Sequence, residues 1–518
     1  MSDRNPGFRR KKCLKFWGWL AVGLAILLIV WSVGGNYVAS LQEREIERDL
    51  AEFAQRFPNT EPNDSALKLA ALAAKLGVGT GGTVFPFDRY MRSSPDLTAS
   101  EEDKETFEDI REELGDYLNA QITKPDDTFD SPSEKLQRYL ASKQVVLAEI
   151  RQQVLTNEAP HWGTDITAML EGDLTAPLPS YLLQAILQQV LAVDILEKYR
   201  KGQTEATAEM LEVSWKVNPS LRESPILISQ LVALIISRYQ VGVMRKLNDL
   251  PTEWLQGLQE RDYREPLLTS LQVEALYVFK FWQDFIWEYS TSLILENLGV
   301  DSYFDLFTVL DKISLDIPRG ENVPLQATIL GLTLDEITLE RILDWTLSNA
   351  IFWFKPVMKP YIRFSAIDSY WVKQRSLAAS RQQNVCVSDS MAVDGFAWWN
   401  YIGRTLDSHW MSNQPSKVNK SILDLELTQK ILQVKALAAQ AGKWPSSVPE
   451  MESSICPGAK WLYRLAPDGT MSISFSEQPE WLEERLENKG LPFTYSDKTP
   501  PKPPTQTPNP QAATPQKR

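Results

Sequence analysis

Hydrophobic residues concentrate most strongly in one run near the N-terminus of the 518-residue chain. This run, Phe16–Val38, contains no charged residue and exceeds the about 20 apolar residues that a membrane-spanning helix requires. The basic residues before it are Arg4, Arg9, Arg10, Lys11, Lys12 and Lys15. Because basic residues are retained on the cytoplasmic side of a span, this cluster predicts a single-pass anchor with a cytoplasmic N-terminus and an extracytoplasmic body. A cleaved signal peptide is the alternative, although Val33-Gly34-Gly35 is a poor cleavage site.

Beyond this run, apolar residues recur mainly at the spacing of an α-helix, which predicts a mainly α protein. The predicted helices are Leu41–Phe57, Ala66–Leu76, Thr98–Leu118, Glu134–Thr156, Tyr181–Lys201, Glu205–Val217, Pro225–Leu247 and Ser421–Ala441. Pro225–Leu247 is apolar almost all round, so a second span is an alternative for this helix. Because Arg238 interrupts it, we favour a buried helix in an α-helical bundle or hairpin array.

Near the C-terminus the pattern changes from helical spacing to strict alternation. Trp461, Tyr463 and Leu465 alternate with more polar positions before Pro467-Asp468-Gly469, and a second alternating stretch follows it. This pattern predicts a β-hairpin directly after the last helix. From Thr499 onward the chain is rich in proline, which predicts a disordered tail.

Together these patterns divide the chain into six predicted regions. They are a cytoplasmic basic flank (1–15), a transmembrane anchor (16–38), a helical stalk and linker (39–130), an α-helical domain (131–410), a helix plus β-hairpin unit (411–498) and the tail (499–518).

One predicted helix pair resembles the second half of a tetratricopeptide hairpin. Gly202-Gln203 separates its helices, small residues alternate with Leu211 in the second helix, and Pro219 follows its end. The chain shows no second copy with the same period, so we predict a single hairpin. Such hairpins usually offer surfaces to other polypeptides, which makes Gly202, Leu211, Trp215 and Pro219 candidate interaction residues.

The C-terminal unit resembles the small C-terminal unit of type II secretion pseudopilins. The resemblance covers about Leu423–Phe475 and includes Gly442-Lys443-Trp444-Pro445 and Cys456-Pro457-Gly458. It implies a local shape only, because no prepilin cleavage motif precedes the anchor. Across its length the chain resembles membrane-anchored bacterial envelope proteins, a similarity that implies no activity.

The net charge of the chain narrows the classes of partner that it can bind. The formal charge of −13 argues against a nucleic-acid partner, which requires a concentrated basic surface.

Of three cysteines, only Cys386 and Cys456 follow the anchor, where an oxidising compartment permits a disulfide. Two unpaired buried thiols are the alternative.

No recognisable catalytic, metal-binding or cofactor-binding motif stands out, so catalytic residues stay unassigned and no metal or cofactor is predicted. The spacing G-x-G-x-x-G occurs at Gly77–Gly82, but it follows a helix instead of opening one, which indicates a turn. A glycosidase needs only two suitably spaced carboxylates, and Asp301, Asp305 and Asp311 are candidates near an aromatic-rich region. Whether the chain is an enzyme is therefore open.

Our leading interpretation is an extracytoplasmic structural or interaction protein of the cell envelope that presents a helical domain to protein partners. The alternative is an envelope glycan-binding or glycan-hydrolysing protein that uses paired carboxylates and aromatic platforms.

Overall fold

The computed structural model describes most of the chain outside a long central gap. The described ranges are 6–78, 99–171, 179–248, 262–288, 355–382, 395–400, 403–404, 414–449, 451–476 and 491–501, with residues 250, 254, 257, 258, 384, 386 and 479. The predicted tail beyond residue 501 lies outside these ranges, as do Asp301, Asp305 and Asp311.

The described chain is mainly helical, as predicted, and ends in a small antiparallel sheet. The helices are α1 (Pro6–Arg56), α2 (Asp64–Lys75), α4 (Glu101–Ile122), α5 (Glu134–Ser142), α6 (Gln144–Thr156), α7 (Ile166–Leu170), α8 (Tyr181–Arg200), α9 (Thr204–Val217), α10 (Pro219–Glu223), α11 (Leu227–Lys246), α13 (Arg264–Glu288), α18 (Lys355–Gln382) and α20 (Gln414–Ala441). The strands are β1 (Trp461–Leu465), β2 (Met471–Phe475) and β3 (Thr494–Asp497).

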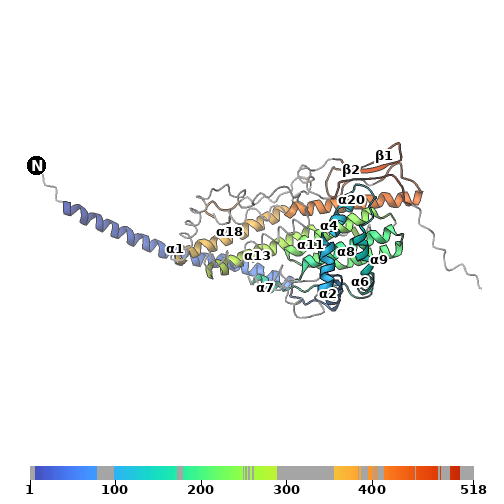
Figure 1. The fold of residues 1–518 in the computed structure, drawn as a ribbon. Helices are drawn as coiled ribbons and strands as arrows, with labels where there is room; N and C mark the ends of the chain where they lie inside the picture. Colours follow the sequence, from blue (N-terminus) through green and yellow to red (C-terminus); the bar gives the residue numbers. More distant parts are fainter. Residues whose placement is uncertain are drawn as a thin grey trace, which may run out of the picture.

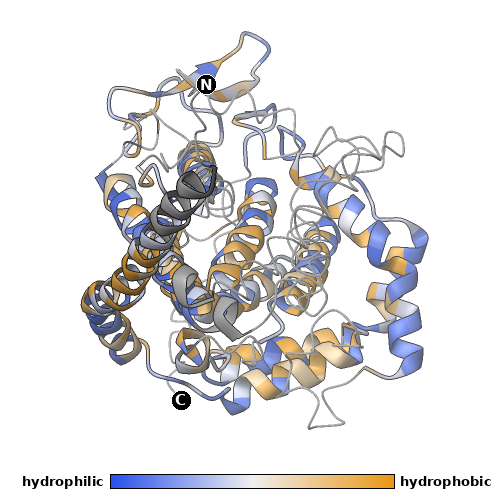
Figure 2. Cartoon of the chain, turned by 90° about the vertical axis from the view of Figure 1, so that its left-hand side faces the viewer, coloured by the Kyte–Doolittle hydropathy of each residue, from blue (hydrophilic) through white to orange (hydrophobic). Residues whose placement is uncertain are grey.

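Helix α1 projects from one end of an elongated body (Figure 1). Its apolar segment is long enough to cross a membrane, and the most apolar window in that segment has no buried residue. The end view shows the apolar colouring of this helix and hydrophilic helices at the opposite edge of the body (Figure 2). The predicted apolar N-terminal helix is therefore present, and it continues without a break to Arg56.

The second half of α1 belongs to the body instead of forming a free stalk. Ala39, Ile46 and Phe53 recur every seven residues and are buried in the main core. This heptad spacing keeps one side of a helix against a neighbouring helix, here α18. The predicted helical stalk and linker (39–130) thus includes part of α1 that packs in the main core.

Helices α8 and α11 lie in the interior and pack against each other. The apolar window of α11 is 89% buried by protein, so α11 is a core helix, as its interrupted apolar run suggests. One contiguous core extends from α1 to α20 and includes side chains from both the predicted stalk and the predicted helical domain.

The C-terminal sheet has the order β1-β2-β3. Trp461 pairs with Phe475 and Leu465 with Met471, which confirms the predicted hairpin, and β3 adds to β2 in antiparallel register. One face of this sheet packs on α20 around a second, smaller core that includes Leu427, Ile431 and Trp461.

A buried polar contact joins this sheet unit to the helical body. Arg245 of α11 donates hydrogen bonds to the Asp424 carboxylate at 3.1 Å, to Thr428 Oγ1 at 2.9 Å and to the Pro492 carbonyl oxygen at 2.9 Å. Lys435 donates to the carbonyl oxygen of Arg245 at 2.8 Å. A buried guanidinium requires such hydrogen-bond partners, so these bonds hold α20 in one position against α11.

Candidate functional site

An open groove between α2 and α6 is the candidate binding site among the described residues. Its volume is about 400 Å³. The side chains that line it are Lys68, Ala71, Leu72, Lys75, Glu149, Gln152, Gln153, Thr156 and Asn157. In Figure 1, α2 and α6 lie in the part of the body remote from the projecting end of α1.

The groove combines a short apolar strip with a polar rim. Leu72 and Ala71 are partly buried against the main core, whereas Lys75 and Glu149 form an exposed ion pair across the groove at 3.4 Å. An exposed ion pair of this kind contributes little to stability. The groove therefore places one short apolar strip beside exposed charged and amide side chains.

The C-terminal end of α2 is held rigidly, which fixes one wall of the groove. Gly77 adopts φ +83° directly after the helix and approaches the Asp103 carbonyl oxygen of α4. The Tyr139 hydroxyl donates to the Leu76 carbonyl oxygen at 2.7 Å. The turn predicted at Gly77 is thus present, although the rest of its glycine-rich motif lies outside the described residues.

An ion pair between Lys143, which joins α5 to α6, and Asp103 of α4 lies beside this turn. Lys143 pairs with the Asp103 carboxylate and donates to the Lys75 carbonyl oxygen at 2.9 Å. Burial raises the pKa of Asp103, but the bonds from Lys143 and Ser100 outweigh it, so the net pKa lies below its ordinary value. Asp103 therefore stays ionised and keeps Lys143 in place.

The predicted interaction hairpin forms as α8 and α9; of its four candidate residues Leu211 is buried, Trp215 and Pro219 are half-buried and Gly202 is exposed. Leu211 is fully buried in the main core, and Trp215 packs edge-on against Trp254 with ring centroids 5.2 Å apart. Gly202 takes φ +71° in the connection, and Pro219 opens α10. Helix α9 packs against α6, which forms one wall of the groove.

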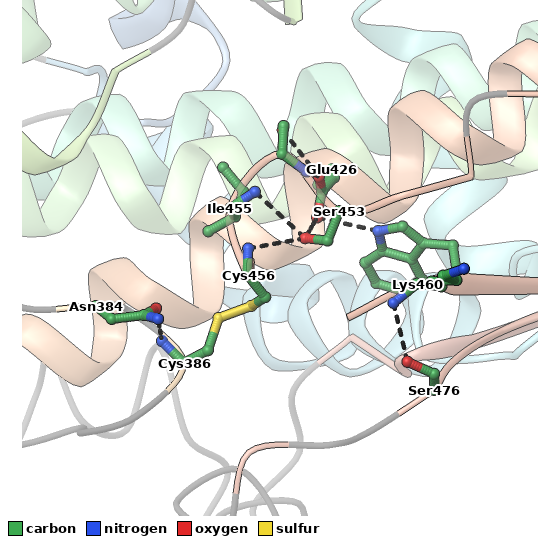
Figure 3. The surroundings of a disulfide bond; sticks show 10 residues. Asn384, Cys386, Glu426, Ser453, Ile455, Cys456, Lys460 and Ser476 are labelled. Carbon is green, nitrogen blue, oxygen red and sulfur yellow. Dashed lines mark hydrogen bonds between the residues drawn. A yellow bond between two sulfur atoms is a disulfide. The ribbon is translucent and has the colours of Figure 1, made fainter. Parts of the chain in front are cut away.

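Cys386 and Cys456 are joined by a disulfide, with Cα atoms 5.6 Å apart (Figure 3). The bond ties a residue that follows α18 to the connection between α20 and β1. Sequence could propose this pair from compartment and number, whereas only the fold shows that the two residues meet.

Beside the disulfide, the Glu426 carboxylate of α20 organises the same connection. It accepts a hydrogen bond from the Ser453 hydroxyl at 2.7 Å (Figure 3). It also accepts from the Ser454 hydroxyl at 2.9 Å and the Trp461 indole at 3.0 Å. A buried carboxylate with this many donors is satisfied. Glu426 is therefore a structural residue, and nothing in its sequence context marked it.

The aromatic-rich segments supply core packing more than binding platforms. Phe279, Trp282 and Tyr370 are buried, whereas Trp398 is 85% exposed. The described residues that line the α2/α6 groove include one carboxylate and no aromatic ring. Among all described residues no group of three or more potential metal ligands occurs.

Comparisons with known proteins found no relative of this chain. No protein-family model, curated protein sequence or solved structure matches the chain.

Proposed function

We propose that this protein is a membrane-anchored, extracytoplasmic interaction protein of the cell envelope. In this proposal α1 holds the helical body at the membrane surface, and the α2/α6 groove binds a segment of a protein partner. The observation that carries the proposal is the continuity of α1, whose exposed apolar part leads without a break into the part packed against α18.

This continuity supports a rigid tether. A helix of this length that exposes apolar side chains is suited to be covered by lipid, and Leu27, Ile29 and Val33 are each more than 60% exposed. Since the same helix carries Ile46 and Phe53 into the core, the body cannot swing freely about a linker. The basic residues before the span favour a body outside the cytoplasm.

The position of the groove supports partner binding away from the membrane. Helices α2 and α6 belong to the part of the body remote from the projecting apolar helix, so lipid does not cover them (Figure 1). Extracytoplasmic polypeptides with a polar surface and one apolar anchor would fit the groove.

Fusion reporters test the anchor and its orientation. With alkaline phosphatase or green fluorescent protein fused after Arg518, we expect an active phosphatase and a dark fluorescent protein. The full chain should also stay with membranes after alkaline carbonate extraction and be released by detergent. Cytosolic fluorescence, or release by carbonate alone, would contradict the proposal.

Site-specific photocrosslinking in intact cells tests the groove. A photoreactive residue in place of Gln152, which is exposed in the groove, should give a reproducible protein adduct. The matched control is Asp468, which is exposed in the β1–β2 turn outside the groove. Equal adducts at both positions, or none at Gln152, would count against a groove-bound partner.

A further inference from the structure

The strongest unexplained feature outside the groove is the exposed indole of Trp398. Its side chain is 85% exposed, although it lies in a segment, Gly395–Asn400, that is firmly bonded to α18. An exposed tryptophan that is held in place presents an amphipathic ring to a partner, and such rings are favoured where one end is apolar and the other wet. The position of this segment along α18 identifies that partner.

Helix α18 runs parallel to α1. Contacts between the two helices therefore show which residues of α18 lie level with the apolar segment of α1. Pro360 contacts Gly35, Arg363 bonds Asn36 and Glu43, and Tyr370 bonds Asp49. The first turns of α18 therefore lie level with the last turns of the apolar segment, and its later turns lie farther from the membrane.

The segment with Trp398 runs back along α18 toward this membrane end. Arg375 donates to the Gly395 carbonyl oxygen at 3.4 Å, and Ala397 donates to the Asp368 carboxylate at 3.0 Å. Farther along, the Trp399 ring packs edge-on against Phe364 at 6.5 Å between centroids. Trp398 thus lies close to the level of Phe364.

Aromatic contacts then connect the segment to the exposed face of α1. Phe364 packs against Trp31 at 6.1 Å between centroids, and Trp31 is 40% exposed within the apolar segment. Tyr37, one residue before the end of that segment, is 65% exposed. Trp31 is about 10 Å from Val38 along the helix axis.

The level of Gly35 and Asn36, which meet Pro360 and Arg363, corresponds to the border of the lipid headgroup region. The apolar segment of 23 residues would be about 34 Å long as a helix, slightly more than the hydrocarbon core of a bilayer. Its last turns therefore reach the membrane–water interface, where tryptophan and tyrosine rings are favoured.

We propose that Trp398 inserts into the headgroup region of the bilayer as a second membrane contact beside α1. The contact rests on the proposed anchor and adds to it, because one helix alone leaves the tilt of the body undetermined. Two contacts on the same side of the body, α1 and the Trp398 segment, fix that tilt.

Hydrogen bonds to α18 hold the Gly395–Asn400 segment rigidly. Asn400 donates to the Ser365 carbonyl oxygen at 3.1 Å and to the Asp368 carboxylate at 2.9 Å. The Tyr361 hydroxyl donates to the Trp399 carbonyl oxygen at 3.2 Å. Because these groups hold the backbone on both sides of Trp398, its ring is presented at a fixed depth.

Depth-dependent fluorescence quenching tests this contact on the full chain. In a Cys13→Ser background the remaining two cysteines are bonded, so Trp398→Cys provides one free thiol for an environment-sensitive fluorophore. Because Trp398 is exposed, the change leaves the core intact. The matched control is Val145→Cys on α6, where the native side chain is 70% exposed.

The labelled proteins are reconstituted into phosphatidylethanolamine–phosphatidylglycerol vesicles that contain spin-labelled phosphatidylcholine. We expect blue-shifted emission and about two-fold or stronger quenching at position 398 relative to position 145. Equal quenching in protein that floats with the vesicles would overturn the Trp398 contact and leave the anchor intact. Failure to float would refute the anchor and the Trp398 contact together, so flotation separates the two failures.

Discussion

Glu43 of α1 and Arg363 of α18 form a largely buried, bidentate ion pair. Both carboxylate oxygens of Glu43 accept from the guanidinium, which also donates to the Asn36 carbonyl oxygen at 3.0 Å. This pair lies where the apolar segment ends and the packed part of α1 begins. It connects the proposed anchor to the body.

Removing the guanidinium should destabilise the docking of α1 on α18. Arg363→Ala leaves the Glu43 carboxylate buried without its partner, so we expect a loss of about 3–5 kcal/mol in the free energy of unfolding. Denaturant titration of the detergent-solubilised chain, followed by tryptophan fluorescence, measures this change.

The matched control is Glu45→Gln on the same helix. Glu45 pairs with Arg48 at 3.8 Å, and both side chains are more than half exposed. We expect a change of at most about 1 kcal/mol. If Arg363→Ala were as mild as this control, the ion pair would not hold the two helices together.

Loss of the disulfide should destabilise the C-terminal unit. The bond spans a sequence separation of 70 residues, for which loop-closure entropy predicts about 4 kcal/mol. A Cys386→Ser, Cys456→Ser double variant should therefore expose the connection around Ser453 to limited proteolysis. Cys13→Ser is the control and should give the wild-type digestion pattern; identical patterns for all three proteins would contradict the prediction.

Two glycine substitutions should separate backbone strain from a steric clash. Gly77→Ala places a methyl group 2.5 Å from Phe107 Cβ and against the Asp103 carbonyl oxygen, so we expect a loss of about 3 kcal/mol. Gly202→Ala meets nothing within 4 Å and should cost only about 1 kcal/mol, from its positive φ. Denaturation midpoints measure both values, and equal losses would show that the α2–α4 contact is looser than described.

The Asp497 carboxylate should make stability depend on pH. Burial, followed by the nearby Asp127 charge, raises the pKa of Asp497 from 3.8 to about 6. The folded state then binds a proton more tightly than the unfolded chain, so stability falls as pH rises from about 4 to about 6.

Asp497→Asn removes this ionisation while keeping a side-chain oxygen for the Thr499 amide. We expect the variant to gain about 1–3 kcal/mol at pH 7 relative to wild type and little at pH 4. Urea denaturation at the two pH values measures the difference. A gain of equal size at both values would show that the carboxylate charge is not responsible.

Local patterns in the sequence determined the elements that depend on neighbouring residues. The alternation around Pro467-Asp468-Gly469 predicted the β1–β2 hairpin, and the break at Gly202-Gln203 separated α8 from α9. In both cases the signal is short in range, because a turn and its flanking strands or helices are specified within about ten residues.

Contacts between distant residues were decided by the tertiary structure. The heptad of Ala39, Ile46 and Phe53 forms a seam only because α18 lies beside it. Strand β3 is short and ends in the acidic Asp497, so its pattern does not indicate a strand, and pairing with β2 creates it. The α2/α6 groove likewise depends on how two separate helices pack.

By itself the sequence determined the apolar run, the mainly helical composition and the C-terminal hairpin, because these follow from local spacing and length. The tertiary structure alone decided that Arg363 meets Glu43, that Cys386 meets Cys456 and that Trp398 remains uncovered. The physical reason is that burial and pairing depend on side chains brought together from far along the chain, which no local pattern encodes.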